Sequence, residues 1–241
     1  MNGVYSLRHR VCNADTDMFM RLRTSAMFQL LQEASIRHSE ELGVGRARTL
    51  DRGILWVVTL QHAEINRMPE YDEWITVETW PGKTMYCLFP RYYRILDESG
   101  KVLINASAIW THIDRETRKM VPPQKSGIAV DEVVTGHEIA LPAIPASLPT
   151  EFEAEYTVPY SYIDLNRHLN NVHYYDIAEN YLEAARSGRQ LRAVSAEYAG
   201  ELHLDDRLKL RIGSASNRCY VLGEIDKKMF ALSLEYEKET E

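Results

Sequence analysis

The sequence predicts an α+β fold made of two fused copies of one unit, in which a long helix is covered by an antiparallel sheet. Its 241 residues suffice for two domains of about 120 residues each. Two segments have the apolar periodicity of long helices, and a series of strand-like runs follows each of them. Short similarities also align the two halves of the chain.

The helices are expected near the start of each half. The first is predicted over residues 25–42, where apolar side chains recur at helical spacing and Gly43 follows as a stop signal. The second is predicted over residues 172–186, where a broader apolar stripe indicates a helix that other elements wrap around. Gly188 ends it.

After each helix come runs in which apolar residues alternate or cluster as they do in strands. A further strand precedes each helix, and the first of these begins at Tyr5. The order strand, helix and four strands is therefore expected twice. The runs cover residues 54–65, 74–80, 86–96 and 102–113 in the first half, and residues 191–202, 207–212, 220–225 and 229–236 in the second.

The two copies are separated by a proline-rich segment, which is predicted to be a linker because proline interrupts helices and sheets. We therefore divide the chain into an N-terminal domain, a linker and a C-terminal domain, over residues 1–128, 129–154 and 155–241. The repeat is supported by the alignment of residues 231–240 with residues 108–117. Asp164 likewise aligns with Asp17, each ahead of its helix.

The predicted lengths fit one known architecture. A helix of about 16 residues is ~24 Å long, which matches the ~19–24 Å width of a four- or five-stranded sheet. A long helix covered by such a sheet is the hotdog pattern, so two copies predict a double hotdog. Pairing of the two sheets edge to edge would remove exposed strand edges.

The composition excludes several classes of protein. A formal net charge of −7 disfavours nucleic-acid binding, which needs a basic surface. The longest apolar run, residues 54–58, is far shorter than the ~20 residues of a membrane span. The N-terminus lacks the apolar stretch of a signal peptide. Three widely spaced cysteines indicate neither a disulfide framework nor a metal pair, so we expect a cytoplasmic protein.

The segment that carries chemistry contains Asp164, Asn166 and His168 at every second position. In an extended segment these side chains would point the same way. A carboxylate, an amide and an imidazole on one face could hydrolyse a thioester. His168 can move protons near neutral pH, Asn166 can orient it or stabilise an oxyanion, and Asp164 can fix the imidazole tautomer.

Two other interpretations apply to the same segment. Asp164 and Asn166 could form Asx turns, with His168 as an ordinary loop residue. A metal site from Asp164, His168 and His173 has little support, because the spacing matches no metal motif. We therefore expect no metal and no cofactor.

The sequence D-L-N-R-H-L-N-N-V-H-Y-Y, residues 164–175, resembles the signature of the plant and bacterial acyl-acyl carrier protein thioesterases. The resemblance covers nearly the whole chain and includes residues 56–59, 78–82 and 197–201. It implies a double-hotdog fold. It also implies hydrolysis of fatty acyl thioesters of acyl carrier protein, with the acyl phosphopantetheine of that carrier as the partner.

By this resemblance the catalytic residues are Asp164, Asn166, His168 and Glu201. Plant members of the family have a cysteine after the glutamate, whereas this chain has Leu202, which excludes a cysteine mechanism at that position. The general base is either Glu201 or His168. In the first case Glu201 acts on water, and in the second it is the electrostatic partner of His168.

The first copy has Phe19 and Arg21 where the second has Asn166 and His168, so we expect it to hold the acyl chain. The alternatives are a hotdog acyl-CoA thioesterase, a hotdog dehydratase and a non-catalytic acyl-chain-binding hotdog protein. The chain either suffices as a monomer or forms a homodimer. The expected lining of the acyl tunnel is Met18, Phe19, Met20, Met27, Phe28 and Leu31.

Overall fold

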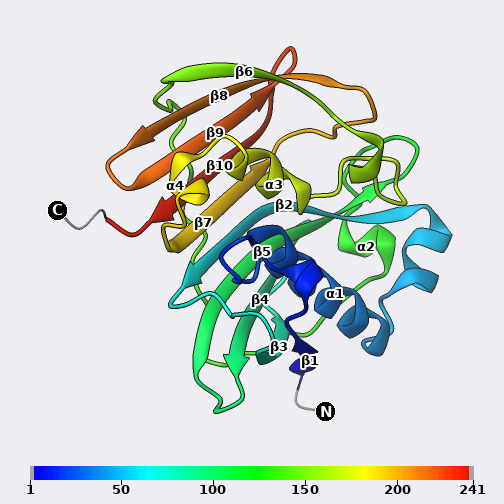
Figure 1. Ribbon diagram of the computed structural model, residues 1–241. Coiled ribbons are helices and arrows are strands. Elements are labelled where there is room, and N and C mark those ends of the chain that lie inside the picture. Colours follow the sequence, from blue (N-terminus) through cyan, green and yellow to red (C-terminus); the bar gives the residue numbers. More distant parts are fainter. Residues whose placement is uncertain (1–2, 239–241) are drawn as a thin grey trace.

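In the computed structural model, which describes residues 3–238, ten strands form one antiparallel sheet (Figure 1). Their order across the sheet is β1-β3-β4-β5-β2-β7-β10-β9-β8-β6. The first-half strands are β1 (Tyr5–Arg10), β2 (Ile54–Ile65), β3 (Trp74–Pro81), β4 (Leu88–Asp97) and β5 (Val102–Asp114). The second-half strands are β6 (Phe152–Thr157), β7 (Leu191–Tyr198), β8 (Arg207–Ala215), β9 (Arg218–Glu224) and β10 (Lys228–Tyr236).

The strand order is the same in the two halves when each is read from its outer edge. The first half runs β1-β3-β4-β5-β2, and the second runs β6-β8-β9-β10-β7. The halves join where β2 pairs antiparallel with β7, with Leu60 opposite Glu197. The predicted double hotdog with sheets paired edge to edge is therefore confirmed.

The helix of the first half, α1 (Thr24–Glu41), lies within a residue of its predicted bounds at each end. Figure 1 shows it lying against the sheet of the first half. Its buried side includes Met27, Phe28 and Leu31, each at most 1% exposed. The apolar periodicity thus predicted both the helix and the side that it buries.

The single long helix predicted over residues 172–186 is wrong. Two shorter helices, α3 (His173–Glu179) and α4 (Glu183–Arg186), occupy this stretch. The chain leaves the helical path at Leu182, whose backbone is extended (φ −96°, ψ 116°) and whose side chain is 3% exposed. Asn180, a weak helix former, lies at the break. Packing of Leu182 into the core thus overrides the helical pattern.

The connection between the halves contains the short helix α2 (Pro123–Ser126). Strand β6 begins at Phe152, inside the range expected for the linker. Elsewhere the strands agree closely with the predicted runs. β2 has the predicted bounds, while β7 ends at Tyr198, four residues earlier than expected. The last residues of the aligned segment 231–240 lie outside the described part of the chain.

Side-chain contacts join the two halves where they meet. Phe28 of α1 stacks on Tyr175 of α3, with ring centroids 4.3 Å apart. The hydroxyl of Tyr198 on β7 donates to the Gln61 side-chain oxygen on β2 at 2.8 Å. These contacts fix α1 and β2 relative to the second half. Among the helices of residues 3–238, none is both long and apolar enough to cross a membrane.

Candidate active site

The segment that carries Asp164, Asn166 and His168 is a tight turn, so the expectation of an extended segment is wrong. The Asp164 carboxylate accepts hydrogen bonds from the backbone amides of Asn166 (2.7 Å) and His168 (3.3 Å). Arg167, between them, has a positive φ of 66°. The carboxylate competes with extended pairing by bonding its own backbone, as Asx turns do.

The turn nevertheless orients the amide of Asn166. Its Nδ2 donates to Asp164 Oδ2 at 3.4 Å, so one carboxylate holds both the backbone of the turn and this side chain. No hydrogen bond joins the Asp164 carboxylate to the His168 ring within residues 3–238. Asp164 therefore shapes the turn. The expectation that it fixes the imidazole tautomer of His168 is not supported, because its carboxylate does not bond that ring in the described residues.

His168 meets Glu201 at this turn, although they come from separate loops. His168 Nε2 lies 3.6 Å from Glu201 Oε2, and the side chains are 18% and 31% exposed. His203 packs edge-on to the His168 ring at a centroid distance of 4.8 Å. Arg118, which follows β5 in the first half, forms an ion pair with the other oxygen of Glu201. The cluster therefore contains groups from both halves.

The surroundings of His168 favour its neutral form. Burial lowers the pKa of His168, and the nearby charges of Arg118 and His203 lower it further, while Asp164 opposes them. Its ordinary pKa is near 6.5. The imidazole is therefore neutral at pH 7, as a group that accepts a proton must be.

A metal ion fits this cluster poorly. His168, Glu201 and His203 offer ligand atoms within 4.8 Å of one another. However, Arg118 already pairs with the Glu201 carboxylate, and its positive charge would oppose a cation there. The other proposed trio does not form, since His173 Nδ1 bonds Asp176 Oδ2 at 2.8 Å and its ring stacks on Tyr162.

The cluster lies in an open hollow with a basic rim. Arg46, Arg115 and Arg167 join Arg118 around it, and Asp51 is the acid there besides Glu201. The local charge is thus positive on a chain that is negative overall. This hollow, which we call the mouth, is lined by Arg46, Leu50, Asp51, Leu55, Arg115, Arg118, Leu165, Asn166, Arg167, His168, Glu201 and His203.

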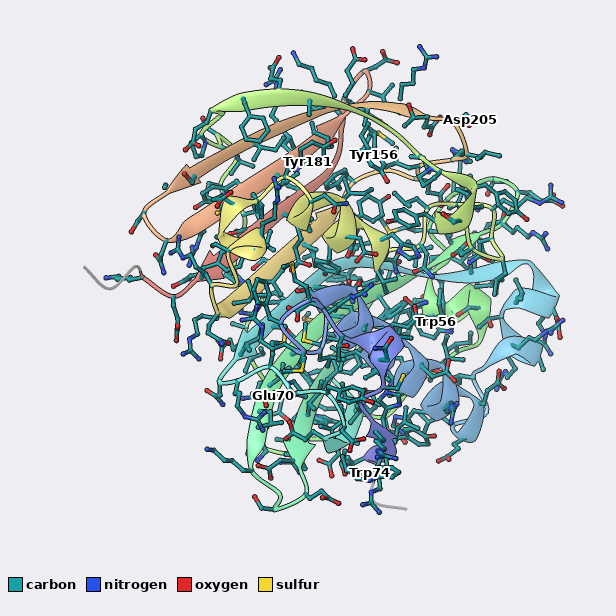
Figure 2. The ribbon with its side chains drawn as sticks, in the orientation of Figure 1. Trp56, Glu70, Trp74, Tyr156, Tyr181 and Asp205 are labelled. Atoms are coloured by element: carbon teal, nitrogen blue, oxygen red, sulfur yellow. The ribbon has the colours of Figure 1, made fainter. Side chains whose placement is uncertain are left out.

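From the mouth a groove of about 520 Å³ runs along α1, and Asn166 lines both spaces. One wall is the side of α1 that includes Gln32, Ser35 and Ile36, and apolar side chains of the sheet form the other. The sheet contributes Ile54, Leu55, Trp56, Phe89 and Trp110. Figure 2 labels Trp56, near the start of β2. The groove belongs mostly to the first half, whereas Asp164 and Asn166 come from the second.

The tunnel lining expected from the sequence is wrong. Met18 and Met20 are 83% and 66% exposed, while Met27, Phe28 and Leu31 pack in the core on the other side of α1. The helical periodicity revealed which side of α1 is buried. It could not reveal that the groove follows the more polar side.

The first half contains a turn of the same design at Asp17. The Asp17 carboxylate accepts from the backbone amides of Phe19 and Arg21 at 2.8 and 2.9 Å, and Met20 has a positive φ like Arg167. Phe19 and Arg21 thus stand where Asn166 and His168 stand in the second half. The alignment of Asp17 with Asp164 is therefore mirrored in three dimensions.

The counterpart of Glu201 can be identified in the same way. The amide of Leu22 bonds the carbonyl of Pro69, and the amide of Leu169 bonds that of Leu202, both at 2.7 Å. Met68 therefore occupies the position of Glu201 in the first half. Figure 2 shows the two loops, marked by Glu70 and Asp205, on opposite sides of the molecule.

This counterpart site is largely filled. Arg21 Nη1 donates to the carbonyl of Gly188 at 3.0 Å and lies over the Phe19 ring. A Cβ on Gly188 would meet that ring at 2.7 Å, so the backbone and the ring are in close contact. A cavity of about 190 Å³ remains. The first half therefore has the turn without the amide, the imidazole or the acid.

Sequence reasoning missed two members of the cluster, His203 and Arg118. His203 comes two residues after Glu201, and this spacing could have indicated that both reach the same site. Arg118 is 83 positions before Glu201 and follows a strand of the other half (201 − 118). No local pattern connects these two residues.

Fold and site together define a double-hotdog protein whose acid, amide and imidazole line a hollow that adjoins the groove along α1. Sequence models of the acyl-ACP thioesterase N-terminal and C-terminal domains match residues 2–129 and 146–237. The chain belongs to the acyl-ACP thioesterase family.

The chain is also similar to individual proteins in sequence and in fold. The dodecanoyl-acyl-carrier-protein hydrolase of Cinnamomum camphora is 25% identical over 200 residues, which cover 76% of this chain and 52% of that protein. A 12:0-ACP thioesterase from Umbellularia californica superposes with a TM-score of 0.82 at 18% identity over 98% of both chains. An acyl-ACP thioesterase from Bacteroides thetaiotaomicron gives 0.80 at 20% identity, also over 98% of both. The chain spans about half the length or less of the first curated relatives that it matches.

Proposed function

We propose that this chain hydrolyses fatty acyl-acyl carrier protein thioesters to free fatty acid and free carrier protein. The observation that carries the proposal is the 3.6 Å approach of His168 to Glu201 in a basic mouth that shares Asn166 with the groove along α1. Such a separation is too long for a direct hydrogen bond and suits a water molecule held between the two side chains. Family membership supports the same reaction.

In the proposed mechanism that water attacks the thioester carbonyl. Glu201 accepts its proton, or the neutral His168 does so with Glu201 stabilising the imidazolium. The side-chain amide of Asn166, oriented by Asp164, donates to the oxyanion. The pantetheine thiolate leaves readily, because thiols have a pKa near 8.5 and need little protonation.

The two halves would divide the work. The second supplies the turn and Glu201, while the first supplies most of the groove for the acyl chain. The arginines of the mouth suit the phosphate of the phosphopantetheine arm, which carries a negative charge. A non-catalytic acyl-chain binder would have no need of the cluster at His168.

The test compares the hydrolysis of matched acyl-carrier-protein and acyl-CoA thioesters by the purified chain, read by the released thiol. Faster turnover of the carrier-protein thioester supports the proposal. Faster turnover of acyl-CoA would favour the acyl-CoA thioesterase alternative. Absence of hydrolysis with both would refute the hydrolase assignment.

Two further expectations belong to this proposal. Cys12, Cys87 and Cys219 are free thiols, which supports a reducing compartment such as the cytosol. Pairing of two chains as a homodimer stays a prediction, and sedimentation of the purified chain measures it.

A further inference from the structure

One charged residue of the groove differs from the others in its environment. Arg91 lines the groove but is only 7% exposed, whereas the other charged lining residues reach solvent. It lies on β4 two residues after Phe89, so both side chains point toward the groove from one face of the strand. A guanidinium stays charged in proteins, so the groove contains a buried cation.

The contacts of Arg91 leave this cation without a counter-ion. Its Nη1 donates to Thr79 Oγ1 at 3.3 Å and to His38 Nδ1 at 3.1 Å, and both partners are uncharged. Burial, with Arg91 beside it, lowers the pKa of His38 to about 4, so the imidazole is neutral at pH 7. Within residues 3–238, no carboxylate lies within ion-pair distance of Arg91.

The acids of the groove are engaged elsewhere. Glu33 pairs with Arg37 at 2.7 Å, and the Glu40 carboxylate accepts from the backbone amide of Arg46 at 2.7 Å. A buried charge is normally paired or binds a ligand, because desolvation without compensation is unfavourable. An acyl chain of methylene groups alone would desolvate Arg91 further and offer it no hydrogen bond.

We propose that Arg91 selects acyl chains that carry a hydrogen-bond-accepting oxygen beyond the thioester, such as a hydroxyl group or a terminal carboxylate. The inference rests on the proposed function and names the class of acyl chain for that same groove. The oxygen accepts from the guanidinium, whose hydrogen bonds with Thr79 and His38 use only Nη1. A buried site built for a polar group discriminates against the analogue that lacks it, because its own donor is then left unpaired.

The test uses acyl-carrier-protein thioesters in a series from short to long chains, each with a methyl, a hydroxyl or a carboxylate at the far end. Measuring kcat and KM for each identifies the length at which an oxygen reaches Arg91. At that length the wild type should prefer one of the oxygenated chains by roughly 10- to 100-fold in kcat/KM. The hydroxyl and carboxylate arms distinguish a neutral from an anionic acceptor.

Variants separate selection from folding. Arg91→Met should lose the preference, so that the ratio of kcat/KM between the oxygenated and the methyl-ended chain falls to near 1. Arg91→Lys should keep part of the preference for oxygenated chains. The matched control Arg94→Met lies on the other face of β4, where Arg94 pairs with Glu78, and should keep all of it. A merely structural Arg91 would lower the rates for all chains together.

Three results would overturn the inference. One is an Arg91→Met variant that still cleaves methyl-ended chains and shows the wild-type ratio of kcat/KM between oxygenated and methyl-ended chains. This result would leave the proposed function intact. Another is a wild type that prefers the methyl-ended chain at every length, a result that holds even where Arg91→Met does not fold. Failure of the wild type to cleave any of the thioesters would remove the proposed function as well.

Discussion

The substitution Glu201→Gln separates the two mechanisms that the cluster allows. It keeps the size of the side chain and removes the negative charge that lies 3.6 Å from His168 Nε2. Arg118 loses its ion-pair partner at the same time. The two choices of general base predict losses of activity of different size.

If His168 is the base, Glu201 acts by stabilising the imidazolium that forms. The Coulomb energy of unit charges 3.6 Å apart at an effective dielectric constant of about 20 is about 4.6 kcal/mol. Because Glu201 is 31% exposed and also faces Arg118, solvent screening and competition reduce this to about 2–3 kcal/mol. Turnover should then fall roughly 30- to 150-fold. If Glu201 itself takes the proton, kcat should fall by roughly 10²–10⁴.

The assay is steady-state release of thiol from an acyl-carrier-protein thioester, with thermal unfolding to check that the variant is folded. Glu197→Gln is the matched control, since Glu197 lies on β7 and pairs with Lys228 outside the mouth. It should keep wild-type turnover. A loss above 10³-fold in Glu201→Gln assigns the base to Glu201, and one of roughly 30- to 100-fold assigns it to His168. Turnover within threefold of wild type would refute a role for Glu201 in either mechanism.

The remaining predictions concern the oxyanion, the pH profile and stability. Asn166→Ala should lower kcat by roughly 10²- to 10³-fold with little change in KM, because the amide acts mainly on the transition state. A rise in KM as large as the fall in kcat would contradict this. Arg118→Gln removes one of the charges that lower the pKa of His168, so that pKa rises and the acidic limb of kcat/KM against pH moves to higher pH; an unmoved limb would exclude His168 as its origin. Burial raises the pKa of Glu179 to about 7, above its value in the unfolded chain, so the folded state holds the proton more tightly and stability falls as pH rises from about 4.5 to about 7. Glu179→Gln should therefore raise the free energy of unfolding by about 1–3 kcal/mol at pH 8 and leave it little changed at pH 4, measured by urea unfolding; equal effects at both pH values would contradict the reasoning.

Much of the fold follows from local patterns. The alternation of residues along β8 and the periodicity of α1 depend only on neighbours in sequence. α1 was predicted within a residue of its bounds, and β8 was predicted from its first residue but extends three residues further. The break at Leu182 was not, because it is set by packing against the core and not by proline or glycine. The helix propensity of neighbouring residues does not reveal where packing against the core will break a helix.

The candidate site shows the same division. Asp164, Asn166 and His168 were selected from their spacing and Glu201 from the family resemblance, and the first three lie in one turn that also meets the fourth. The shape of the turn was wrong because an aspartate that bonds its own backbone outweighs strand alternation. The groove was misplaced because its lining depends on which side of α1 faces open space, and the periodicity of the helix alone does not reveal this.

Under the proposed function, the pairing of β2 with β7 joins a half that holds the reacting groups to a half that supplies most of the acyl groove. We therefore expect substitutions along the groove wall of α1, at positions such as Gln32 or Ile36, to alter which acyl chain is accepted while the turn at Asp164 keeps its geometry. Chain-length preference and rate would then be adjustable independently. In a single hotdog unit that both bound the acyl chain and hydrolysed the thioester, a substitution for one task would also affect the other.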